Sequence, residues 1–126
     1  MTLHHALIRT HHITSRKKVA SLRKAAGKYG CFALLRSGGC PGIMYCKGSE
    51  EGVKEWLSTV QRLRYKDFFL ASKPAAVQLE LCPKGTSTPQ VEDPAGLVEV
   101  ETVGEFHAAM EKRGISAWWR RAMEFA

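Results

Sequence analysis

Three consecutive cations follow a helix-capping residue near the start of the chain. Ser15 precedes Arg16, Lys17 and Lys18, and the apolar residues that come next recur at helical spacing. The helix dipole opposes cations at this end, at a cost of about 0.3–1 kcal/mol each, and the helix predicted after Ser49 begins instead with two glutamates. Free backbone N–H groups, a hydroxyl and three cations together favour a phosphate or a carboxylate. We therefore predict an anion site here, although long side chains that spread into water would explain the same pattern.

The same predicted helix carries a basic ridge. Lys24 and Lys28 follow Lys17 at helical spacing, and residues 15–30 include no acidic residue. A ridge of this kind is typical of proteins that follow a nucleic-acid backbone without reading its sequence. A solvated helix face is the simpler alternative.

Aromatic, basic and histidine side chains also gather on the predicted strands. Tyr45 and Lys47 share one face of a strand, and Arg36 lies on its hairpin partner. His11 and His12 are at the end of the first strand, where an imidazole can stack on a base or bond to a phosphate. An open sheet face with such residues is typical of proteins that bind single-stranded RNA. An aromatic residue in a strand is also a common core residue, and this alternative stays open for Tyr45.

A further basic cluster, Arg64 and Lys66, ends the second predicted helix. Because the helix dipole favours cations at this position, the pair fits a structural role as well as RNA binding.

No pattern in the sequence predicts catalysis, a metal site or a cofactor. The phosphate-loop motif G-x-x-x-x-G-K-[ST] and the zinc-protease motif H-E-x-x-H are absent from the sequence. His11 and His12 are adjacent in a predicted strand, so they should point to opposite faces and not share one metal ion. The cysteines form no C-x-x-C pair, so we expect reduced thiols of an intracellular protein at Cys31, Cys40, Cys46 and Cys82.

Composition and charge indicate a globular protein with an anionic partner. The 126 residues are 44% hydrophobic and 25% charged, with a net charge of +7. The apolar runs are too short to cross a membrane, so no membrane partner is expected. Residues 1–74 carry 14 lysines and arginines against 4 acidic residues, whereas residues 75–126 carry 5 against 8. Like charges repel, so we interpret the basic part as a surface for nucleic acid.

Apolar spacing and turn residues predict the elements that must position these groups. Strands are predicted at residues 7–13, 31–36, 43–47, 67–71 and 75–81, and helices after Ser15, Ser49, Thr102 and Ser116. This order predicts an α+β fold: a ferredoxin-like split βαβ sandwich, β-α-β-β-α-β with an extra strand, plus two C-terminal helices. We expect a single domain, with a core at 1–82, a Pro/Gly-rich loop at 83–96 and a helical extension packed on the core at 97–126.

Short motifs along nearly the whole chain suggest a family. They are HHITSRKK at residues 11–18, GCF at 30–32, PGI at 41–43, KG at 47–48 and RYK at 64–66, with WW at 118–119 and AM at 122–123. Together they resemble the C-terminal domain family of the small nuclear ribonucleoprotein Prp-three, a domain also found after RWD domains. The strand-to-helix turn of that family corresponds to residues 11–18 here.

The resemblance implies a ferredoxin-like, non-catalytic module that binds single-stranded or structured RNA, such as a small nuclear RNA. It also implies other proteins of a spliceosomal or related ribonucleoprotein as partners, and a nuclear location. The alternative is a protein-interaction module of a splicing-related or RWD-type complex, which would use the basic half or the end of the chain around Trp118 and Trp119.

Overall fold

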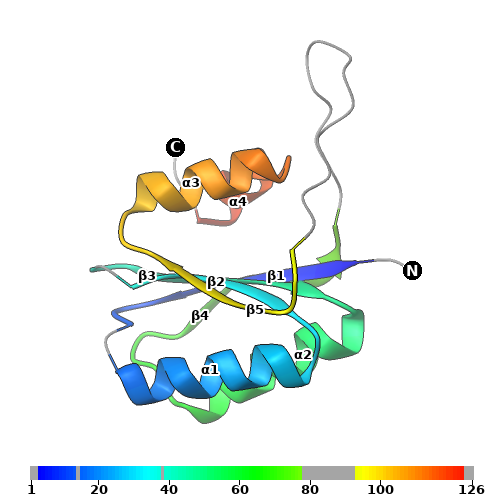
Figure 1. The fold of residues 1–126 in the computed structure, drawn as a ribbon. Coiled ribbons are helices and arrows are strands. Elements are labelled where there is room, and N and C mark those ends of the chain that lie inside the picture. Colours follow the sequence, from blue (N-terminus) through cyan, green and yellow to red (C-terminus); the bar gives the residue numbers. More distant parts are fainter. Residues whose placement is uncertain (1–2, 14, 38, 78–92, 124–126) are drawn as a thin grey trace.

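The chain is an α+β protein, and the computed structural model describes its residues 3–13, 15–37, 39–77 and 93–123. Within these ranges, five strands form one mixed sheet and four helices pack against it (Figure 1). The elements are β1 (His4–Thr10), α1 (Arg16–Lys28), β2 (Phe32–Arg36), β3 (Gly42–Gly48), α2 (Glu50–Arg62), β4 (Phe69–Ala76), β5 (Gly96–Val100), α3 (Val103–Lys112) and α4 (Ser116–Met123). No helix in the described ranges has the length and apolar character needed to cross a membrane.

The sheet is covered by helices on both faces. Its strand order is β4-β1-β3-β2-β5, in which β5 pairs parallel to β2 and all other neighbours are antiparallel. The helices α1 and α2 cover one face, whereas α3 and α4 cover the other (Figure 1). The central strands β1, β3 and β2 are therefore enclosed between two helical layers.

Alternate residues of these strands fill two separate cores, as the period-two geometry of a strand requires. On the face of α1 and α2, Ile8 and Met44 belong to a cluster with Val19, Leu22 and Trp56. On the face of α3 and α4, the cluster contains Leu7, Ile43, Tyr45, Phe106, Met110 and Trp119. Trp56 and Trp119 both pack inside the protein, since their side chains are buried.

The helix boundaries follow the predicted capping residues. Ser15, Ser49 and Thr102 are N-caps whose side-chain oxygens accept a backbone N–H of the first turn. Gly30 and Gly114 follow helices with φ of 66° and 72°, the left-handed conformation that glycine adopts at low cost. Local chemistry at the helix ends therefore determines where three of the four described helices begin.

Three of the five predicted strands differ from those in the structure. The first strand ends at Thr10 rather than residue 13, because the backbone N–H of His11 donates to the Lys66 carbonyl in another loop. One strand, β4, replaces the two predicted at 67–71 and 75–81, and residues 78–81 lie outside the described ranges. Pro74 does not break β4, because β4 is an edge strand and Pro74 lies at an irregularity in its pairing with β1, between Ser72 and Ala75.

The fifth strand of the sheet comes from the C-terminal part of the chain. Residues 32–36 of β2 pair in register with residues 96–100 of β5. The segment predicted as a helical extension thus also contributes a strand to the same sheet, and most of the predicted loop at 83–96 lies outside the described ranges.

Gly42 permits the close approach of β3 to the end of β1. A Cβ atom at this position would lie 2.4 Å from Oγ1 of Thr10 and 2.7 Å from Cγ1 of Ile13. The backbone N–H of Gly42 donates to the carbonyl of His11 at 3.2 Å, so the same contact holds the loop that follows β1. The absence of a side chain here is therefore a packing requirement.

We expect Gly42→Ala to destabilise the fold by about 1–3 kcal/mol, the usual cost of inserting a methyl group into a packed site. Gly27→Ala is the matched control, because a Cβ atom there would meet no other atom within 4 Å. It should stabilise α1 by about 0.5–1 kcal/mol. Urea unfolding of both variants measures the difference, and equal stabilities would contradict this account of Gly42.

Candidate nucleic-acid interface

The first turn of α1 has the predicted cap and lacks acidic residues. The Oγ atom of Ser15 accepts the backbone N–H of Lys18 at 3.2 Å, so the hydroxyl is engaged within the helix. The first turn contains no acidic residue, whereas that of α2 contains Glu50 and Glu51. The contrast between the two helices, which the sequence indicated, is present in the structure.

Arg16 is neutralised within the chain, which corrects its predicted role as a phosphate ligand. Its two terminal nitrogens donate to the carboxylate of Glu99 on β5, at 2.8 and 3.1 Å. Arg23 lies 3.6 Å from the same carboxylate, and the Ser37 hydroxyl donates to it at 2.9 Å. The hydrogen bonds from Arg16 are the main reason that the pKa of Glu99 lies below its usual value. The positive charge of Arg16 is thus paired with an acidic residue from the C-terminal part of the chain.

Four other cations lie at one end of the molecule, and we call them the basic end: Lys17, Lys18, Arg64 and Lys66. The ammonium group of Lys18 lies 4.9 Å from the ring centroid of Tyr65, which brings the start of α1 against the turn after α2. Lys17, Arg64 and Lys66 are exposed. None of the four forms an ion pair with another described residue.

The predicted ridge continues from this end along α1. Lys24 and Lys28 are both exposed, and Lys28 lies 5.4 Å from the ring of Tyr29. The buried side of the same helix consists of Val19, Leu22, Ala25 and Ala26. The basic residues therefore lie away from the core, where a ligand can reach them.

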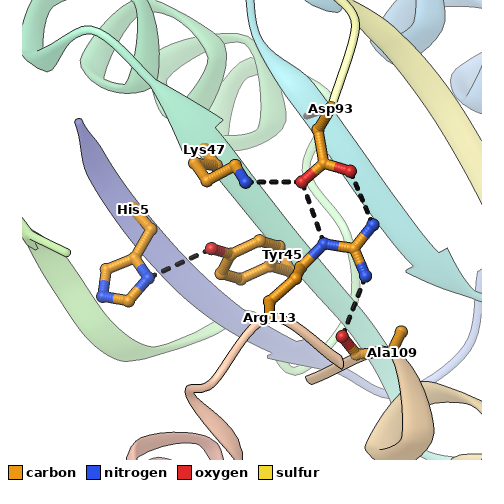
Figure 2. Close-up of polar contacts among 6 residues, drawn as sticks. All are labelled: His5, Tyr45, Lys47, Asp93, Ala109 and Arg113. Atoms are coloured by element: carbon orange, nitrogen blue, oxygen red, sulfur yellow. Dashed lines mark hydrogen bonds and ion pairs between the residues drawn. The ribbon is translucent and has the colours of Figure 1, made fainter. Parts of the chain in front are cut away.

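Tyr45 is a core residue, so its predicted role in stacking on bases was wrong. Its side chain is completely buried, and its hydroxyl lies 3.1 Å from Nδ1 of His5 (Figure 2). The ring of Trp118, from α4, stacks on His5 with 3.9 Å between centroids. The C-terminal helices cover the sheet face on which bases would have had to stack.

Lys47 is also engaged internally, which corrects its predicted contact with RNA. Its ammonium group pairs with Asp93, and the same carboxylate accepts hydrogen bonds from Arg113 at 2.7 and 2.9 Å (Figure 2). Burial opposes ionisation of Asp93, but the hydrogen bonds from Arg113 and Lys47 outweigh it and lower the pKa of this carboxyl. Arg113 also donates to the carbonyl of Ala109 at 2.8 Å, which fixes the cluster to α3.

The side chain of Arg36 forms hydrogen bonds with backbone carbonyls and is not directed at a ligand. Its guanidinium donates to the carbonyl of Glu101 at 3.1 Å and to that of Pro41 at 2.8 Å. The predicted sheet-face role of Arg36 was therefore wrong, because its donors tie the turn between β2 and β3 to the residue after β5.

His11 and His12 lie in the loop after β1, not in the strand. Nδ1 of His11 is 3.4 Å from a carboxylate oxygen of Asp67. The ligand atoms of His11, His12 and Cys40 all lie within 4.8 Å of one another. Because His11 and His12 follow the strand and do not lie in it, both side chains can approach the same ion, and no short sequence pattern links Cys40 to them.

The comparisons with known proteins bear on the fold alone. No family model matches the chain, and no curated protein matches it either. The solved structure of BlrP1 BLUF is similar, with a TM-score of 0.52 and 15% sequence identity. The match covers 80% of this chain and 66% of that chain, so this chain spans just under two thirds of the neighbour's length. At this identity the similarity concerns the arrangement of helices and strands.

The buried contact between His5 and Tyr45 predicts a pH-dependent stability. Burial, with a smaller contribution from the charge of Lys47, lowers the pKa of His5 from 6.5 to about 4. Folded His5 stays neutral while the unfolded chain takes up a proton below pH 6.5. Stability should therefore fall as the pH drops from about 6.5 towards 4, by at most about 1.4 kcal/mol per pH unit.

Urea unfolding at about pH 7 and about pH 5 measures this effect. His5→Gln should reduce the loss of stability between the two conditions, because it removes the group whose pKa is lowered by burial. An equal loss in wild type and His5→Gln would refute the assignment.

Proposed function

We propose that this chain is a non-catalytic RNA-binding module with a ferredoxin-like fold, of the Prp-three C-terminal domain type. The fold assignment is supported by the order β1-α1-β2-β3-α2-β4, with both helices on one face and β5 as an added strand. The family assignment is supported by two of the motifs, whose described residues 11–13, 15–18 and 64–66 lie together at one end of the sheet. We propose a nuclear ribonucleoprotein as its setting.

The observation that carries the proposal is the contrast between paired and unpaired cations. Arg16, Lys47 and Arg113 are neutralised by carboxylates of the chain itself. The basic end has no such counter-charge among the described residues, although its cations lie beside a helix N-terminus that already favours anions. Keeping these charges close together opposes folding, so their persistence favours an external anion.

RNA phosphates fit this surface better than bases do. The sheet face is covered, and Tyr45, the strand aromatic proposed from sequence for stacking, is buried. Contacts would therefore run along the RNA backbone from the basic end to Lys24 and Lys28. Binding of this kind depends on salt and discriminates little between sequences.

The protein-interaction alternative loses one of its two proposed surfaces. Trp119, on α4, is buried in the core that α4 shares with α3, and Trp118 stacks on His5, so α4 packs on the sheet through both residues. An acidic protein at the basic end remains the competing ligand, and it is distinguished from RNA by a pull-down that resists nuclease.

Charge reversal at the basic end tests the proposal. Lys17→Glu combined with Lys66→Glu should weaken binding of a short single-stranded RNA by at least about tenfold. It should also reduce the slope of log affinity against log salt by about 0.7 for each phosphate that the variant no longer neutralises. Fluorescence anisotropy at two salt concentrations measures both quantities.

Arg120→Glu combined with Arg121→Glu is the matched control, because these exposed arginines lie on α4, on the opposite side of the sheet. This variant should bind RNA nearly as wild type does. Equal decreases in affinity in the two double variants, or wild-type binding that is insensitive to salt, would exclude the proposed surface.

Glu99→Gln tests the same surface by a gain of affinity. The substitution releases Arg16 and removes the carboxylate beside Arg23, so RNA should bind about two- to fivefold more tightly at low salt. The fold should tolerate the change, because exposed ion pairs contribute only about 0–1 kcal/mol. Glu101→Gln, at an exposed neighbour, removes the same charge without releasing Arg16 and should have a smaller effect. A Glu99→Gln variant that binds RNA no better than Glu101→Gln would show that Arg16 does not contribute.

A further inference from the structure

Three loops meet at the end of β1, and His11 lies at their junction. The backbone N–H of His11 donates to the carbonyl of Lys66, in the turn between α2 and β4, at 3.0 Å. Its carbonyl accepts the N–H of Gly42, at the end of the turn between β2 and β3, at 3.2 Å. These bonds bring side chains from three distant parts of the sequence to one place.

The side chains at this junction are those that bind transition metals. Nδ1 of His11 lies 3.9 Å from Sγ of Cys40 and 3.4 Å from a carboxylate oxygen of Asp67. The ligand atom of His12 lies within 4.8 Å of those of His11 and Cys40. The histidine rings are 4.2 Å apart and nearly perpendicular, at 84°, so they do not stack face to face.

Two of the separations lie close to the edge length of a coordination polyhedron. Zinc bonds of about 2.0–2.3 Å in a tetrahedron place neighbouring ligand atoms roughly 3.3–3.8 Å apart. The contacts from His11 to Cys40 and Asp67 lie close to this range. The contact with Asp67 is longer than the usual hydrogen bond from nitrogen to oxygen, about 2.7–3.2 Å, whereas the contact with the Cys40 sulfur is also within reach of a hydrogen bond. The ligand atoms of His11, His12 and Cys40 already lie within 4.8 Å of one another, and Asp67 approaches this group through His11. His12, Cys40 and Asp67 are exposed, so their side chains have room to turn toward an ion.

We propose that His11, His12 and Cys40 bind a zinc ion, with Asp67 as the fourth ligand. Two imidazoles, a thiolate and a carboxylate form a donor set that suits zinc, whereas calcium and magnesium require oxygen ligands. The thiolate and the carboxylate together cancel the two charges of the ion, so the site adds no positive charge next to the basic end. Four protein ligands leave no open position, so the ion acts as a clip between the three loops rather than as a catalyst.

The site is separate from the proposed RNA contact, because it needs none of the lysines and arginines of the basic end. The full chain is first reduced with a reductant that contains no thiol, because a thiol would itself bind zinc. It should then bind a single Zn²⁺ ion with a Kd below about 10 μM, measured by competition with a chromogenic chelator. Co²⁺ in place of zinc should give the near-ultraviolet absorption of a thiolate-to-metal charge transfer. Zinc should also raise the Tm, since an ion that binds only the folded chain stabilises it.

Single substitutions identify the ligands. Cys40→Ser should abolish the cobalt charge-transfer band, and His11→Ala and His12→Ala should each weaken zinc binding by at least about tenfold. Asp67→Asn should weaken it by about tenfold or more, and an unchanged affinity would exclude Asp67 as a ligand. Far-ultraviolet circular dichroism checks that each variant is folded.

Cys82→Ser and His107→Ala are the matched controls, since each removes the same type of donor from another part of the sequence. Both should bind zinc as wild type does. The proposal is overturned by wild-type protein that binds no zinc in this range. It is equally overturned if Cys40→Ser retains the charge-transfer band or Cys82→Ser loses it.

Discussion

Burial of both sheet faces is the constraint on which the other features of this protein depend. The residues of β1, β3 and β2 alternate between two cores, one under α1 and α2 and one under α3 and α4. A side chain on these strands therefore has little freedom to face a ligand, and polar groups there must find partners inside the protein. The Tyr45 hydroxyl contacts His5 at hydrogen-bond distance, and Lys47 forms an ion pair with Asp93. Surfaces for a ligand are left on the helices and on the loops at the ends of the sheet.

The lysines and arginines of the N-terminal part fall into two groups: some pair with carboxylates of the chain itself, and others have no such partner among the described residues. Glu99 and Asp93, both from the acidic C-terminal part, neutralise cations of the N-terminal part. Part of the basic excess in residues 1–74 is therefore balanced inside the folded chain. Strand β5 pairs with β2, and this pairing places Glu99 beside Arg16 at the start of α1. The remaining excess lies at the basic end and along α1. Sequence composition alone could not separate these two parts, since the pairs join residues up to 83 positions apart.

Local signals in the sequence predicted local structure well. The caps at Ser15, Ser49 and Thr102 and the apolar stripes of the helices were correct, because each depends on residues within one or two turns. The pairing of β5 with β2, the covering of the sheet face over Tyr45 and the proximity of Cys40 to His11 were not predicted. Each of these depends on a long-range contact, and no short pattern of residues encodes such a contact.

The turn between α2 and β4 connects the two surfaces proposed for this protein. Arg64 and Lys66 belong to the basic end, and Asp67, the next residue, approaches His11. An ion held by His11 and Asp67 would fix this turn against the loop that leads into α1, and so fix the spacing between Lys66 and Lys17. Side chains held at a set spacing lose less conformational entropy when they bind a polyanion. In this arrangement the zinc ligands would hold the loops in place, and the lysine and arginine side chains of the basic end would bind the RNA phosphates.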